Sequence, residues 1–155
     1  MTSYSIRYSF IQPFSVPAAM AYEWCTDFKP DDLARMGMKG TRKVERLNDD
    51  TIILTDRLQD KRERKQRLVR LNPDRLSWTS THLTGPNRFS QFWYRIGPNG
   101  PGESRLEFTG LQVNYGKRPS DAKIAEMAKE LRADDSGMWV LLAKDMRKDL
   151  VGQRQ

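Results

Sequence analysis

The feature that most constrains the fold of this sequence is a long helical stretch near its end, over residues 121–151. Its apolar residues recur at helical spacing and form one continuous stripe. The residues of the stripe are Ile124, Met127, Ala128, Leu131, Met138, Leu142 and Met146. So long a stripe needs a large apolar partner, and the only one available is a sheet built from the preceding chain. A long helix laid across a curved sheet encloses space, which is a candidate ligand cavity.

The chain before this helix consists mostly of short strand-like segments separated by turns. The first segment, residues 4–10, alternates polar and apolar residues, and Pro13 and Pro17 are predicted to end it. Later segments are predicted at residues 41–47, 51–58, 63–71, 76–83, 89–96 and 104–115. Turns at such short intervals require hairpins, so the sheet should be antiparallel. Gly110, inside the last segment, predicts a bulge or a sharp bend.

Two short helices are predicted between the first strand and the second. One covers residues 18–27 with Pro17 at its start, and the other reaches residue 36 from a cap at Asp31 or Asp32. The long helix has Ser120 as its predicted N-cap. Residues 133–137, Ala-Asp-Asp-Ser-Gly, leave two interpretations open: the helix breaks there and restarts, or it continues and carries Asp135 on its buried stripe.

Length and composition indicate the class of protein. The chain has 155 residues and a single cysteine, Cys25, so we expect one domain, no internal disulfide and a reducing compartment. The N-terminus does not resemble a signal peptide, and no run approaches the ~18 apolar residues of a membrane span. We therefore expect a soluble, cytoplasmic monomer or homodimer.

The net charge of +7 suits acidic partners, and much of the excess lies between Arg57 and Arg70. This stretch is either a solvated outer face of the sheet or a contact surface for nucleic acid or an acidic protein. With one histidine and one cysteine, the chain has no pattern of metal ligands, and it has no phosphate-binding glycine loop. We predict no metal and no cofactor.

Two segments carry a resemblance to a known family. Residues 14–28 begin Phe-Ser-Val-Pro-Ala-Ala and continue through Tyr22 and Trp24 to Phe28. Residues 92–110 contain a Gly-Pro hairpin followed by Arg-Leu-Glu-Phe. With the order of elements, these segments resemble the helix-grip fold of the START-like (SRPBCC) superfamily, which includes birch-pollen-allergen-like and polyketide cyclase/dehydratase-like proteins.

The resemblance implies an α+β helix-grip fold in which residues 1–155 form a single START-like domain. In this fold, a curved seven-stranded antiparallel sheet, two short helices and one long C-terminal helix surround a cavity. The resemblance also implies a hydrophobic ligand, of lipid-, polyketide- or hormone-like chemistry.

Strand alternation and helical spacing suggest which side chains face that cavity. Trp78 and His82 share one face of their strand, as do Phe92 and Tyr94 of the next, whereas the inward face of residues 51–58 is undecided. Asp135 would need a partner on a buried stripe, either Arg57 or a ligand. The candidate ligand-binding residues are Arg57, Trp78, His82, Phe92, Tyr94, Phe108, Met127, Leu131, Asp135 and Met138.

Three functions fit these features. The first is binding of a hydrophobic or aromatic small molecule between the sheet and the long helix. The second is a polyketide cyclase or dehydratase in which His82 carries protons, with Tyr94 or Asp135, because the pKa of histidine lies near neutrality. The third is a basic-surface domain that contacts protein or nucleic acid.

Overall fold

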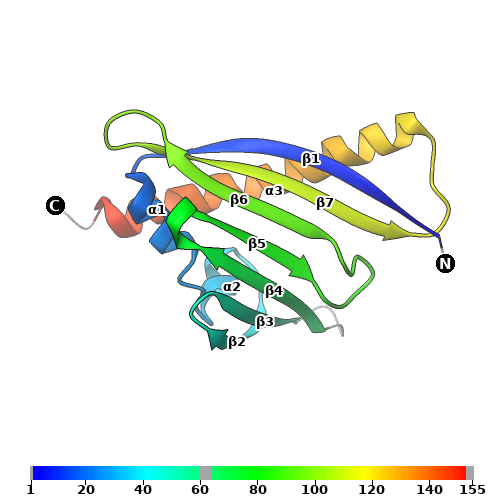
Figure 1. Cartoon of the computed structure of the whole chain (residues 1–155), viewed down its shortest axis with the longest axis horizontal. Helices are drawn as coiled ribbons and strands as arrows, with labels where there is room; N and C mark the ends of the chain where they lie inside the picture. The colour runs from blue at the N-terminus through cyan, green and yellow to red at the C-terminus, as the bar shows by residue number, and fades with distance from the viewer. Residues whose placement is uncertain (1, 60–63, 153–155) are drawn as a thin grey trace.

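The computed structural model describes residues 2–59 and 64–152 (Figure 1). Its elements are, in chain order, β1 (Ser3–Phe14), α1 (Ala18–Cys25), α2 (Asp32–Arg35), β2 (Gly40–Asn48), β3 (Thr51–Leu58), β4 (Arg64–Asn72), the 3-10 helix η1 (Pro73–Arg75), β5 (Ser77–His82), β6 (Gln91–Pro98), β7 (Ser104–Tyr115) and α3 (Asp121–Leu150). The predicted order is confirmed, with η1 added. The start of the predicted strand at residue 63, and Lys61 and Arg62 of the basic stretch, lie outside the described residues.

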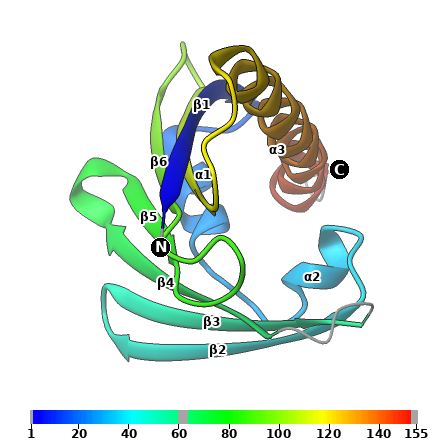
Figure 2. The same cartoon turned by 90° about the vertical axis from the view of Figure 1, so that its right-hand side faces the viewer.

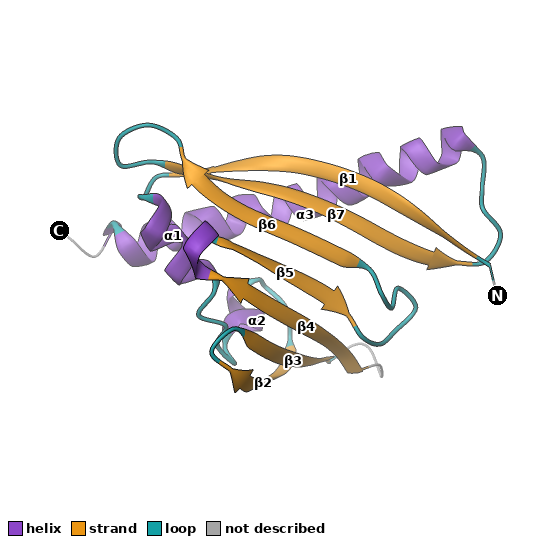
Figure 3. Cartoon of the chain, in the orientation of Figure 1, coloured by secondary structure: helices purple, strands orange, loops and turns teal. Residues whose placement is uncertain are grey.

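The strands form one seven-stranded sheet in the order β1-β7-β6-β5-β4-β3-β2, in which every neighbouring pair is antiparallel. Figure 2 shows the sheet curving from β1 to β2, with α3 and α2 on its concave side. Figure 3 shows the same arrangement coloured by element type, with α3 running along the side of β1. The predicted helix-grip architecture is therefore confirmed.

The first strand runs through Pro13 and ends at Phe14, so the prediction that Pro13 ends it is wrong. Pro13 pairs with Arg105 of β7. The reason is the position of β1 at the edge of the sheet, where a residue without an N–H group can face outward and leave no ladder hydrogen bond unmade.

The long helix is continuous from Asp121 to Leu150, so the interpretation that it breaks at residues 133–137 is wrong. The hydroxyl of Ser136 donates to the carbonyl of Ala133 at 3.3 Å, within the helix, instead of capping a new one. Trp139 and Met146, beyond the weak segment, are buried against the sheet. Their packing outweighs the low helix propensity of the serine and glycine.

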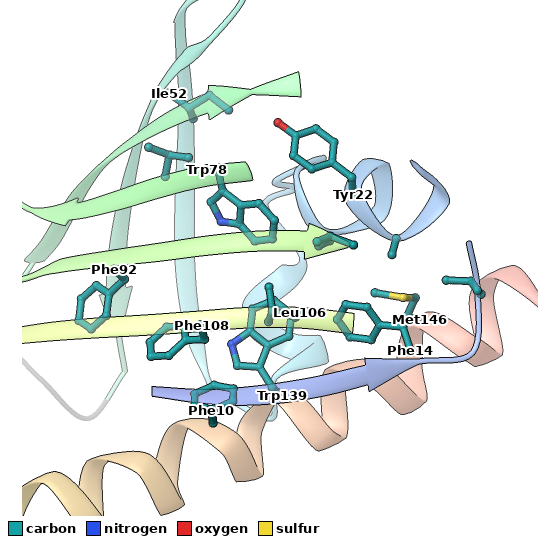
Figure 4. Close-up of a cluster of buried hydrophobic side chains, with 14 of the residues drawn as sticks. Phe10, Phe14, Tyr22, Ile52, Trp78, Phe92, Leu106, Phe108, Trp139 and Met146 are labelled. Carbon is teal, nitrogen blue, oxygen red and sulfur yellow. The ribbon is translucent and has the colours of Figure 1, made fainter. Parts of the chain in front are cut away.

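The core lies between the concave face of the sheet and the helices α1 and α3 (Figure 4). Aromatic rings fill much of it, and Phe10 stacks on Phe108 with ring centroids 4.5 Å apart. Trp139 and Met146 of α3 meet the sheet beside Phe14 and Leu106. This packing fixes α3 over β1 and its neighbours.

The register of β7 with β1 and with β6 is unbroken at Gly110. The predicted bulge at this glycine is therefore absent. Gly110 instead makes room for Tyr8, its partner on β1. A Cβ atom at Gly110 would lie 2.7 Å from Cζ of the Tyr8 ring. The missing side chain therefore allows the Tyr8 ring to lie flat across β7.

Replacing Gly110 should be costly because the Tyr8 ring would have to move. We expect Gly110→Ala to lower the free energy of unfolding by about 1–3 kcal/mol, the usual cost of overpacking. Gly97→Ala in β6 is the matched control, since no heavy atom lies within 4 Å of its added Cβ. Urea unfolding of both variants checks this, and equal stabilities would contradict the role given to Gly110.

Candidate functional site

A cavity of about 340 Å³ lies between the concave face of the sheet and the second half of α3. The strands β2 to β6 supply its floor, and α1, α2 and the loops that flank α2 supply its sides. Met138, Trp139 and Leu142 of α3 form its roof together with Asp135. The second half of the long helix therefore both covers this open space and packs on the core through Trp139 and Met146.

Part of the wall is aromatic. The rings of Trp78 and Tyr94 stack with centroids 4.6 Å apart and an interplanar angle of 2°. Trp139 of α3 lies above Tyr94, with the two ring centroids 5.9 Å apart. These three rings give the cavity an aromatic lining that can contact an apolar molecule.

The neighbouring strands β2, β3 and β4 carry a buried ion network beside these rings. Nε and Nη2 of Arg42 donate to the two carboxylate oxygens of Asp56 at 2.8 and 2.9 Å, and Nη2 of Arg67 donates to Asp56 at 3.0 Å. Burial of Asp56 alone would raise the pKa of its carboxyl group. The hydrogen bonds and charges of Arg42 and Arg67 outweigh burial and hold that pKa below its ordinary value. The network is thus ionised at neutral pH.

His82 lines the cavity from β5, directly opposite Arg67 of β4. Burial lowers the pKa of the imidazole to about 4, helped by the positive charges of Arg67 and Lys65. His82 is therefore neutral at pH 7, whereas the proton-carrier hypothesis relied on an ordinary histidine pKa near neutrality. Its ring packs 5.0 Å from the ring of Phe92.

Asp135 faces the cavity from α3 and accepts a hydrogen bond from the hydroxyl of Tyr8. The expected pairing of Asp135 with Arg57 is wrong, because the side chain of Arg57 is exposed outside the cavity. Burial raises the pKa of Asp135, while the Tyr8 hydrogen bond opposes the shift and the charge of Asp134 adds to it. Burial also raises the pKa of Tyr8.

The structure brings together one part of the predicted site. Of the candidate residues, those lining the cavity are Trp78, His82, Tyr94, Asp135 and Met138. Phe92 and Phe108 are buried in the core, and Leu131 packs against it. Met127 is half-buried and Arg57 is exposed, and neither lines the cavity. The undecided strand β3 turns its even-numbered residues inward, so that Asp56 faces the cavity.

Several cavity residues were missed by sequence reasoning, notably Trp24, Arg42, Asp56, Arg67 and Trp139. One signal for Arg67 was available. It alternates in β4 with Val69, which is buried in the core, so both point inward.

The basic stretch is divided between the two faces of the sheet. Arg57, Arg64 and Arg70 are exposed, whereas Lys65 and Arg67 line the cavity. Its positive charge therefore contributes both to the surface and to the site.

The described residues contain no group of three or more histidine, cysteine, aspartate or glutamate residues placed to hold a metal ion. Within residues 2–59 and 64–152, no helix has the length and hydropathy needed to cross a membrane.

No protein-family model and no curated protein matches the sequence. Solved structures do match. An aromatase/cyclase, Zhui, from a Streptomyces species is 12% identical with a TM-score of 0.75, covering 96% of this chain and 98% of that one. Norcoclaurine synthase from Thalictrum flavum, in complex with dopamine and hydroxybenzaldehyde, is 9% identical with a TM-score of 0.68, covering 99% and 90%. A START superfamily protein from Mycobacterium smegmatis is 14% identical with a TM-score of 0.67, covering 92% and 98%. The chain thus has the START-like helix-grip fold.

The titration of His82 can be followed directly by NMR, because it is the only histidine in the chain. We expect a pKa of about 4 in place of the ordinary 6.5. Arg67→Gln should raise the pKa by removing a nearby positive charge. Arg70→Gln should leave it unchanged, since Arg70 is exposed and lies on the opposite face of β4. A wild-type pKa near 6.5 would show that His82 is not buried in the cavity.

Removal of the Tyr8 hydroxyl should raise the pKa of Asp135 further, because its hydrogen bond favours the ionised carboxylate. Carbon-13 NMR titration of Tyr8→Phe, with Tyr4→Phe as control, measures this shift. A raised folded-state pKa means that ionised Asp135 destabilises the fold at neutral pH, and that this cost disappears as the pH falls below the unfolded-state value of about 3.9. An unchanged pKa in Tyr8→Phe would exclude the proposed bond.

Proposed function

We propose that this protein binds a hydrophobic or aromatic small molecule in the cavity between the sheet and α3. The observation that carries the proposal is the cavity itself, about 340 Å³ in volume, with the stacked Trp78 and Tyr94 in its wall. Ligand sites are typically mostly apolar spaces of this size, with a few polar groups that set orientation. A molecule with one or two rings suits the volume.

Polar groups that lack a partner support the same proposal. The hydroxyl of Tyr94 and the imidazole nitrogens of His82 make no hydrogen bond to any residue that the structure describes, and both side chains line the cavity. Both groups line the cavity, where a ligand can supply the missing hydrogen bonds. A ligand that satisfies these groups is therefore favoured and oriented.

The matched structures support the proposal through the fold. One of them was solved with dopamine and hydroxybenzaldehyde, which are single-ring aromatic molecules. The cavity of the present protein combines the same architecture with its own aromatic wall.

A second candidate function is proton transfer on the bound molecule, as a polyketide cyclase or dehydratase requires. The observation that favours it is Asp135 at the roof of the cavity, which accepts a hydrogen bond from Tyr8 of β1. A carboxylate with a raised pKa can accept a proton from a carbon next to a carbonyl group and return it to oxygen. Under this alternative Asp135 moves the proton, since the low pKa of His82 makes it a weak base.

Blocking the cavity should abolish binding of a neutral aromatic probe. We expect 1-naphthalenemethanol to bind the wild-type protein, and Leu142→Trp to weaken this binding about tenfold or more, because its ring would occupy the cavity. Leu141→Trp is the matched control, since Leu141 is the next residue of α3 and is 55% exposed. Isothermal titration calorimetry measures both affinities, with circular dichroism to confirm folding.

Two outcomes would contradict the proposal. The first is absence of probe binding to the wild-type protein. The second is equal weakening by Leu142→Trp and Leu141→Trp, which would place the probe outside the cavity.

A further inference from the structure

Adjacent strands place hydrogen-bond donors side by side on one wall of the cavity. Arg67 of β4 lies opposite His82 of β5, and Trp78, on the same face of β5, lies opposite Tyr94 of β6. All four residues line the cavity. Donors from β4, β5 and β6 therefore border an aromatic surface.

Only one of the three guanidinium nitrogens of Arg67 donates a hydrogen bond to a residue that the structure describes. Its Nη2 donates to Oδ2 of Asp56 at 3.0 Å, but the same carboxylate already accepts two hydrogen bonds from Arg42. Nε and Nη1 of Arg67 donate to no residue that the structure describes. The side chain is 27% exposed, so these donors are largely withdrawn from bulk solvent while still reaching the cavity.

The other nearby carboxylates are held by other groups. Asp27 lies 3.6 Å from Nζ of Lys29, Asp32 lies 3.4 Å from Nη1 of Arg42, and Asp135 at the roof accepts a hydrogen bond from Tyr8. Among the described residues, Asp56 is therefore the one carboxylate that contacts Arg67. Lys65 lines the same wall and adds positive charge there.

We infer that the ligand is an aromatic acid, with its carboxylate against Arg67, His82 and Tyr94 and its ring against the indole of Trp78. This inference rests on the proposed function and adds the chemical class of the ligand. A carboxylate accepts charge-assisted hydrogen bonds from a guanidinium, and these are stronger than bonds between neutral groups. The neutral imidazole and the tyrosine hydroxyl can each donate one more. A neutral alcohol of the same size leaves the charge of Arg67 without this partner.

The electrostatics of the wall agree with this assignment. After burial, the positive charges of Arg67 and Lys65 are the causes that lower the pKa of His82. A positive potential that disfavours the imidazolium form favours a bound anion at the same place.

Calorimetry with two probes of the same ring system tests the inference at pH 7.5. In the wild-type protein, 1-naphthoate should bind about tenfold or more tightly than 1-naphthalenemethanol. Arg67→Gln should remove this preference by weakening the binding of 1-naphthoate about tenfold or more, while Asp56 keeps its two hydrogen bonds from Arg42. Arg70→Gln, which removes the same charge from the outer face, should keep the preference.

A second measurement uses the wild-type protein alone, in case Arg67→Gln does not fold. Bound 1-naphthoate should raise the pKa of His82 by placing a negative charge beside it, whereas bound 1-naphthalenemethanol should not. Equal affinities for the two probes, a preference that survives Arg67→Gln, or an unchanged pKa of His82 with 1-naphthoate would overturn the inference and leave the proposed function standing. Binding of neither probe would overturn both.

Discussion

A buried ion pair decides where the core of this protein ends and its cavity begins. Along β3 the inward residues Ile52 and Leu54 are fully packed, and the next inward residue is Asp56, paired with Arg42. The side chains of Arg42 and Asp56 are only 3% and 8% exposed. Such a pair must be matched by polar groups, because the desolvation of two charges offsets much of their attraction. The sheet therefore packs on the helices at one end and stays open at the other.

The roof of the cavity is fixed by the same combination of apolar packing and one polar bond. Trp139 and Met146 anchor α3 to the core, and Tyr8 of the edge strand β1 donates a hydrogen bond to Asp135. That bond depends on Gly110, whose missing side chain leaves space for the Tyr8 ring. The position of Asp135 is thus set by the sheet as well as by the helix.

Local patterns in the sequence predicted the element order, the antiparallel sheet and much of the roof and aromatic wall, because residue spacing determines which side chains share a face. They could not choose the inward face of β3, where both alternating sets contain isoleucine or leucine, and so Arg57 was selected in place of Asp56. The tertiary contacts of the site residues could not be predicted either. Tyr8 and Asp135 are 127 positions apart, and spacing within an element carries no information on what faces it. Propensity likewise failed at residues 133–137, where tertiary packing keeps the helix intact.

The polar groups of the site are held in place before any ligand arrives. Arg67 donates a hydrogen bond to Asp56, which also accepts two hydrogen bonds from Arg42. Asp135 accepts a hydrogen bond from Tyr8. Groups fixed in this way lose little conformational freedom on binding, so more of their interaction energy appears as affinity. The donors lie on the sheet and the acceptor lies on the helix, with stacked rings nearby in the wall. Under the proposed function, a ligand would have to satisfy these polar groups as well as fill the aromatic part of the cavity.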